Sequence, residues 1–222
     1  MEPGAFLPHL CVVNQSLQTK KTNTMKIGII GTGAIGKAFA GQAAKAGYEI
    51  VISNSRGAAS LEAIAKQLGS KVKAGSIEEA ATADVVFLGL PWKSVEAVTS
   101  SVPSWKGRIV IDPTNPIINP GFIVPDLGGA ASSEVVAKLV PGASVVKAFN
   151  TFPPEILATD PKQAGGKRVI FYSGNDAAAK QVVAGIISRI GFAGIDLGTL
   201  HEGGRLQQFP GGPLPALNLI KM

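Results

Sequence analysis

The chain has 222 residues, of which 45% are hydrophobic and 16% are charged, and it carries a formal net charge of +6 at pH 7. This balance is typical of a globular α/β protein, and the single Cys11 excludes an intramolecular disulfide and a cysteine-based metal cluster. No basic run interleaved with aromatic residues indicates nucleic acid, and no segment is long and apolar enough to span a membrane. Because the chain has a single cysteine, a reducing, cytoplasmic setting is expected.

Residues 1–24 differ in composition from the rest of the chain. The stretch 5–13 is apolar, but Pro8 and His9 interrupt it and no basic residue precedes it, which is unlike a signal peptide. We expect these residues to form a disordered N-terminal tail, and Met25 to open the first strand.

From residue 26 onward, apolar strand-like runs alternate with helix-like runs, several of which end at glycine. In chain order we predict strands at 26–30, 49–53, 72–74, 84–90, 108–112, 144–149, 168–173 and 193–197, and helices at 34–46, 58–68, 77–82, 93–102, 132–139 and 176–190. This alternation predicts a doubly wound, parallel α/β sheet of the Rossmann type. Residues 25–150 form the expected dinucleotide-binding domain, and residues 151–222 a small C-terminal α/β extension on the acceptor side.

The first predicted strand runs directly into a glycine-rich turn, Gly31-Thr32-Gly33-Ala34-Ile35-Gly36, that opens the first helix. In such a turn Gly31 allows the sharp reversal, Gly33 lets a pyrophosphate approach the backbone, and Gly36 lets the helix pack on its strand. The helix N-terminus adds unpaired N–H groups and a partial positive charge. The order of strand, turn, helix and second strand therefore predicts dinucleotide binding rather than an ordinary glycine turn.

The end of the second strand indicates which nicotinamide cofactor is bound. NAD sites usually place a carboxylate there, to accept a hydrogen bond from the ribose 2′-hydroxyl. This chain instead has Asn54-Ser55-Arg56, a polar and basic group that suits a 2′-phosphate. The alternative is that Ser55 caps the next helix and Arg56 is only solvated. We predict a preference for NADPH.

Four segments resemble the NADPH-dependent deazaflavin (coenzyme F420) reductases, and two others are similar to the NADPH-oxidising domain of the related STEAP metalloreductases. The first set comprises Gly31–Gly36, Asn54–Arg56, Leu90-Pro91-Trp92 and Gly204-Arg205-Leu206. The second set comprises Asp112-Pro113-Thr114-Asn115-Pro116 and Val145–Thr151. The resemblance extends over residues 26–215.

This resemblance implies roles for further residues. Thr32, Ser55 and Arg56 are implied to hold the 2′-phosphate. The groove for the cofactor is implied to be lined by Leu90, Pro91, Trp92, Asn115 and Pro116, and the nicotinamide and acceptor to lie beside Ala148, Phe149 and Asn150. Packing remains open as an alternative role for Trp92, and a turn role for Asn115 and Asn150.

Hydride transfer between a nicotinamide and a flavin-like ring needs little side-chain chemistry, so we assign no catalytic residue and no metal. We expect an NADPH-dependent oxidoreductase, acting as a homodimer on a small-molecule acceptor such as coenzyme F420, FMN or FAD. Reduction of a small imine or hydroxyacid, and a non-catalytic NADP(H) sensor, remain alternatives. His201 suits either an acceptor contact or a surface position, and Lys147 either an acidic substrate or a snorkelling stem.

Overall fold

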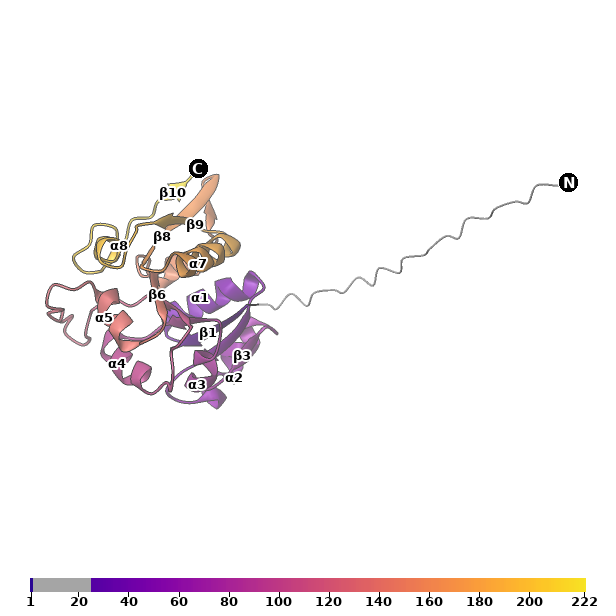
Figure 1. Ribbon diagram of the computed structural model, residues 1–222, viewed down its shortest axis with the longest axis horizontal. Helices are drawn as coiled ribbons and strands as arrows, with labels where there is room; N and C mark the ends of the chain where they lie inside the picture. The colour runs from indigo at the N-terminus through magenta and orange to yellow at the C-terminus, as the bar shows by residue number, and fades with distance from the viewer. Residues whose placement is uncertain (2–24) are drawn as a thin grey trace.

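The first strand, β1 (Lys26–Ile30), lies inside the sheet, where it pairs in parallel with β2 (Glu49–Ser53) on one side and β4 (Val85–Leu88) on the other. The computed structural model that gives this arrangement describes Met1 and residues 25–222. Within them the sheet has ten strands, and its main path runs β10-β8-β6-β5-β4-β1-β2-β3. Helices cover both faces of this sheet (Figure 1).

The first half of the chain alternates strands and helices as predicted. Its remaining elements are α1 (Ala34–Lys45), η1 (Ala58–Leu61), α2 (Glu62–Leu68), β3 (Val72–Ala74), α3 (Ile77–Ala81), α4 (Trp92–Ser100), β5 (Ile109–Asp112), α5 (Ser132–Leu139) and β6 (Ser144–Ala148). The predicted helix at 58–68 begins as the separate 3-10 turn η1, a common way for an α-helix to start.

The second half extends the same sheet. Its elements are α6 (Pro154–Leu157), β7 (Lys162–Gln163), β8 (Gly166–Gly174), α7 (Ala177–Ile190), β9 (Ala193–Asp196), α8 (Glu202–Gln207) and β10 (Ile220–Lys221). The predicted doubly wound sheet is confirmed and is mostly parallel, but β8 lies antiparallel to β6. The chain reaches β8 through the short segment α6–β7, with no long crossover helix, so the strand returns along β6 in the opposite direction.

The sequence did not predict α8, because two of its six residues, Gly203 and Gly204, have poor helix propensity. Tertiary contacts explain the first of them. A Cβ atom on Gly203 would lie 2.6 Å from the Cβ atom of Leu197 and 2.7 Å from that of Ser173. The helix packs so closely on β8 that only glycine fits at this position.

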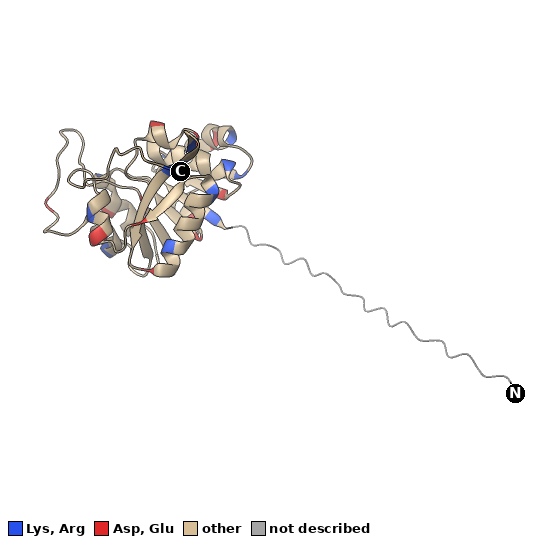
Figure 2. Ribbon diagram, turned by 90° about the horizontal axis from the view of Figure 1, so that it is seen from above, with Lys and Arg blue, Asp and Glu red and all other residues tan. Residues whose placement is uncertain are grey.

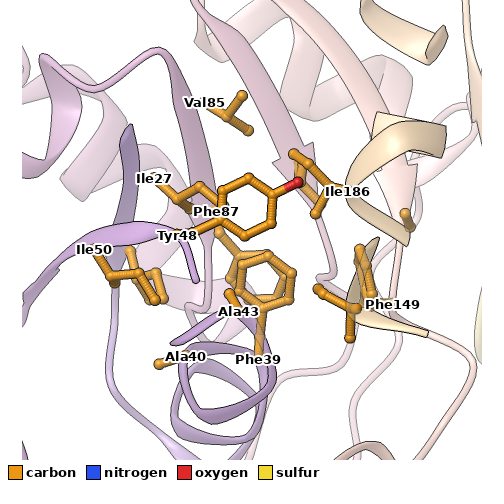
Figure 3. Packing of buried hydrophobic residues seen from close by; sticks show 14 of the residues in the cluster. Ile27, Phe39, Ala40, Ala43, Tyr48, Ile50, Val85, Phe87, Phe149 and Ile186 are labelled. Atoms are coloured by element: carbon orange, nitrogen blue, oxygen red, sulfur yellow. The ribbon is translucent and has the colours of Figure 1, made fainter. Parts of the chain in front are cut away.

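Side chains alternate between the two faces of the sheet and build one core on each. Along β4, Val85 and Phe87 join the core beneath α1 and α7, whereas Val86 and Leu88 join the core beneath α3, α4 and α5. Figure 3 shows the first core, where helix α1 brings Phe39 against Phe87. Charged residues of both signs are interspersed, mainly over the surrounding helices and loops (Figure 2).

Most of the predicted N-terminal tail, residues 2–24 with His9 and Cys11, lies outside the described residues. In the part of the chain that the structure describes, no helix combines the length and the hydrophobicity needed to cross a bilayer.

Candidate functional site

Two glycines of the predicted turn are required by contacts within the protein itself. Gly31 has a φ of +97°, and a Cβ atom there would lie 2.3 Å from the carbonyl oxygen of Gly89. A Cβ atom on Gly36 would lie 2.0 Å from the carbonyl oxygen of Gly31. The Gly31 N–H also donates to the Ser53 carbonyl at 2.9 Å. Helix α1 can therefore start directly against the carboxyl ends of β1 and β4.

Gly33 differs from Gly31 and Gly36 because it faces open space. Its φ is −66°, and a Cβ atom there would have no neighbour within 4 Å. Gly33 is the N-cap of α1, where no side chain caps the helix and the first turn contains no acidic residue. The first N–H groups of a helix have no partner within it, and they carry a partial positive charge. This cradle fits a diphosphate.

A cleft of about 640 Å³ begins at this turn and runs along the carboxyl ends of β1, β4 and β5. Parallel sheets place ligands at this edge. Its lining consists of Gly33, Ala34, Ile35, Gly89, Leu90, Pro91, Trp92, Lys93, Pro113, Thr114, Asn115, Ile117 and Asn119. The predicted glycine turn, the Leu90–Trp92 segment and Asn115 thus share one cleft.

Two predicted residues, Pro116 and Thr32, are buried and do not line the cleft. Pro116 is buried, and Ile117 and Asn119 follow it in the lining. Thr32 is also buried, with 9% of its surface exposed. Lys93 also lines the cleft but was not predicted from the sequence. It directly follows the predicted Leu90–Trp92 segment, and this position could have indicated it.

The turn after β2 presents Arg56 to solvent. The side-chain oxygen of Asn54 accepts hydrogen bonds from the Arg56 N–H at 2.8 Å and from the Ser60 hydroxyl at 3.2 Å, so this amide shapes the turn. Ser55 and Arg56 are exposed, and Arg56 takes part in none of the four ion pairs found among the described residues. Gly57 is the N-cap of η1, so the alternative that Ser55 caps this helix is wrong.

Phe149 belongs to the core, although it was expected beside the nicotinamide. Its side chain is fully buried, with ring centroids 5.0 Å from Phe39 and 6.0 Å from Phe87 (Figure 3). Ala148 is fully buried as well. Neither residue lines the cleft, and the main chain of Phe149 has a φ of +66°. Such a left-handed conformation turns the chain sharply at the end of β6.

Two amide side chains, those of Asn115 and Asn150, connect the cleft to α8. Asn115 donates to the Asn150 carbonyl, and Asn150 donates to the Asn115 side-chain oxygen, both at 3.0 Å. Asn150 also donates to the Gln207 carbonyl, and the Phe209 N–H donates to the Asn115 side-chain oxygen at 3.2 Å. Asn150 is 6% exposed, and its own side-chain oxygen is buried without a hydrogen-bond partner within the described structure.

Lys147 neither snorkels nor reaches a substrate, which corrects both interpretations of it. Its side chain is fully buried, and Nζ lies 2.8 Å from the Thr114 carbonyl, 3.2 Å from the Ser132 hydroxyl and 3.4 Å from Asp112 Oδ2. Asp112 also accepts hydrogen bonds from Thr114 and Ser133. Burial lowers the pKa of the Lys147 ammonium, and the nearby Asp112 opposes this shift. The network supports the floor of the cleft at Thr114.

His201 lies on the surface, where its Nδ1 is 3.3 Å from Glu134 Oε1. No group of three or more potential metal-ligating side chains comes together anywhere in the described residues.

Comparisons with known proteins agree with this geometry. The family described as NADP oxidoreductase, coenzyme F420-dependent, matches residues 26–116. A hypothetical protein, SMa0349 from Sinorhizobium meliloti, is 49% identical, with a TM-score of 0.84 over 90% of this chain and 96% of its own. A candidate F420-dependent NADP-reductase of Arthrobacter sp. FB24 is 30% identical, with a TM-score of 0.67 over 79% of this chain and 86% of its own.

The metalloreductase STEAP3 of Rattus norvegicus is 25% identical over 193 residues, which are 86% of this chain. The chain spans 37% of the length of that metalloreductase. Together, the fold and the cleft define a Rossmann-type α/β protein with a cleft at the carboxyl edge of its sheet. Within this class, the chain belongs to the coenzyme F420-dependent NADP oxidoreductase family.

Proposed function

We propose that this chain binds NADPH and transfers a hydride from it to a flavin-like or deazaflavin acceptor. The observation that carries the proposal is the continuous cleft from the open Gly33 position to Asn115, at the carboxyl edge of the sheet. This edge is where open α/β sheets bind dinucleotides. The family that the chain belongs to supports the same cofactor and the acceptor class.

Different residues along the carboxyl edge of the sheet bind different parts of NADPH. Ser55 and Arg56, at the end of β2, meet the 2′-phosphate, for which the exposed guanidinium is a matched, permanently charged donor. The turn around Gly33 takes the pyrophosphate with backbone N–H groups. The nicotinamide then lies at the opposite end of the cleft, near Trp92 and Asn115.

The protein supplies position and exclusion of water. NADPH supplies the hydride from C4 of its nicotinamide, which with one proton from solvent reduces the acceptor ring while NADPH becomes NADP⁺. Asn115 is held by Asn150, and Thr114 by Lys147, so the cleft floor at this end is rigid before ligands arrive.

Cofactor choice is tested by replacing Arg56. We expect Arg56→Gln to weaken NADPH binding by roughly 10- to 100-fold, because it removes a charge-assisted hydrogen bond, and to leave NADH binding nearly unchanged. Lys106→Gln is the matched control, because this exposed lysine precedes β5 at the opposite edge of the sheet. Calorimetric titration of both nucleotides gives the comparison, and equal losses for NADPH and NADH would overturn the assignment.

Turnover tests the acceptor. The purified chain is mixed with NADPH and with FMN, FAD or coenzyme F420 in turn, and absorbance at the nicotinamide band is followed. We expect oxidation of NADPH with at least one of them. Tight NADPH binding with no turnover on any acceptor would favour the sensor alternative.

A further inference from the structure

Two segments far apart in sequence expose large apolar side chains beside each other at one end of the cleft. Phe122 and Ile123, in the loop after β5, are 53% and 57% exposed, and Phe209, just after α8, is 40% exposed. The rings of Phe122 and Phe209 have centroids 6.0 Å apart at an interplanar angle of 75°. We call Phe122, Ile123 and Phe209 the apolar patch. Exposed apolar side chains gathered in this way mark binding surfaces.

The apolar patch is continuous with the cleft on both of its sides. The loop that carries Phe122 also supplies Ile117 and Asn119 to the cleft lining, and it folds back on itself because Ile118 and Ile123 form a two-residue antiparallel bridge. On the other side, the Phe209 N–H donates to the side-chain oxygen of Asn115, another lining residue. The patch therefore borders the end of the cleft farthest from Arg56.

Two further contacts hold these segments together. Arg205, in α8, donates to the Gly129 carbonyl of the loop, and the Ser132 N–H donates to the Gln208 side-chain oxygen at 2.7 Å. The apolar rings are thus displayed on a tethered framework, which reduces the entropic cost of ordering them around a ligand.

We propose that the apolar patch is the seat for the planar ring of the electron acceptor, with Phe122 and Phe209 as the residues that determine acceptor affinity. This inference rests on the proposed function, which places the nicotinamide at the Asn115 end of the cleft. An acceptor ring has to contact the nicotinamide face, and the patch is the exposed apolar surface that adjoins that end. Edge-to-face aromatic pairs leave ring faces free for offset stacking on a third planar ring.

The test measures acceptor binding directly, without turnover. Protein saturated with NADP⁺ is titrated into FMN while the flavin fluorescence is recorded, for the unaltered chain and for Phe122→Ala and Phe209→Ala. We expect each substitution to raise the Kd of FMN about 5- to 30-fold, because stacking and burial are lost. Phe209→Trp keeps an aromatic ring and is expected to bind FMN as the unaltered chain does. The Kd of NADP⁺, from calorimetry, is expected to stay within about twofold.

Ile195→Ala is the matched control, because Ile195 is a similarly exposed apolar residue on β9, away from the patch. It is expected to leave both Kd values unchanged. Thermal melting of each variant checks that it is folded, and Phe209→Leu provides a milder substitution if Phe209→Ala melts early.

Several results would overturn the inference. FMN affinity in both variants equal to that of the unaltered chain would do so, as would NADP⁺-saturated protein that binds none of FMN, FAD and coenzyme F420. Light scattering that shows a dimer converted to monomer by Phe122→Ala would assign the patch to a second copy instead. Failure of the unaltered chain to bind NADP⁺ would overturn the proposed function as well, which separates the two proposals.

Discussion

Lys147 and Asp112 face each other across the neighbouring strands β6 and β5, with Nζ 3.4 Å from Oδ2 and both side chains fully buried. Removing one partner of a buried pair leaves an uncompensated charge. We therefore expect Lys147→Met to lower the free energy of unfolding by about 3–5 kcal/mol, as measured by urea denaturation. It also removes the hydrogen bond to the Thr114 carbonyl, so NADPH binding should weaken.

Lys138→Met is the control for this substitution, because Lys138 is an exposed residue of α5. It should change the free energy of unfolding by no more than about 0.5 kcal/mol. A loss below about 1 kcal/mol in Lys147→Met would show that the buried pair does not stabilise the fold as its geometry indicates.

The second prediction compares Gly36 and Gly33, two positions of the turn that are glycine for different reasons. Gly36→Ala forces a Cβ atom against the Gly31 carbonyl oxygen, so we expect a large drop in melting temperature. Gly33→Ala meets no neighbour and should change stability by less than about 1 kcal/mol. It should nevertheless weaken NADPH binding, since the methyl group occupies the space proposed for the pyrophosphate.

Gly185→Ala controls for the general effect of adding a methyl group. Gly185 is exposed within α7, and a Cβ atom there also meets nothing within 4 Å. NADPH affinity should not change in this variant. An unchanged affinity in Gly33→Ala would contradict the proposed position of the diphosphate.

Phe149 gives a third prediction, which separates its core role from cofactor binding. Its ring packs edge-on against Phe39 in the core beneath α1. Phe149→Ala should cost about 3–5 kcal/mol of unfolding free energy. The milder Phe149→Leu should remain folded and bind NADPH as the unaltered chain does, by calorimetry. A selective loss of NADPH binding in Phe149→Leu, without loss of stability, would instead indicate that the side chain contacts the cofactor.

Glu134 gives a fourth prediction, concerning pH. The Ala131 N–H donates to Glu134 Oε2 at 2.7 Å, and this hydrogen bond holds the pKa of the carboxyl below its ordinary value of 4.5. Because the folded protein binds this proton less readily than the unfolded chain, the stabilisation is full above pH 4.5 and is lost as the pH falls through the lowered pKa. Glu134→Ala should cost about 1 kcal/mol at pH 7.

The difference between Glu134→Ala and the unaltered chain should shrink in denaturation curves recorded at successively lower pH. Glu96→Ala, at an exposed position within α4, should show no such pH-dependent difference. A Glu134→Ala deficit that persists undiminished in acid would attribute the effect to lost packing rather than to the charged cap.

The chain's own sequence determined the βαβ unit and the glycine turn, because their geometry is local. Gly31 and Gly36 are needed for contacts within a few residues or with the adjacent strand, and the apolar runs fix which segments become strands. The polar end of β2 was equally readable, since Arg56 follows its strand directly in the sequence, and in the structure it is exposed.

Only the tertiary structure decided which residues meet across long separations. Asn115 and Asn150 are 35 positions apart, and the partners of Phe149 come from α1 and β4. The direction of β8 and the existence of α8 likewise depend on how closely these elements pack on their neighbours. Local propensity cannot give such contacts, because the free energy that selects them comes from burial and hydrogen bonding between segments that the linear chain does not place together.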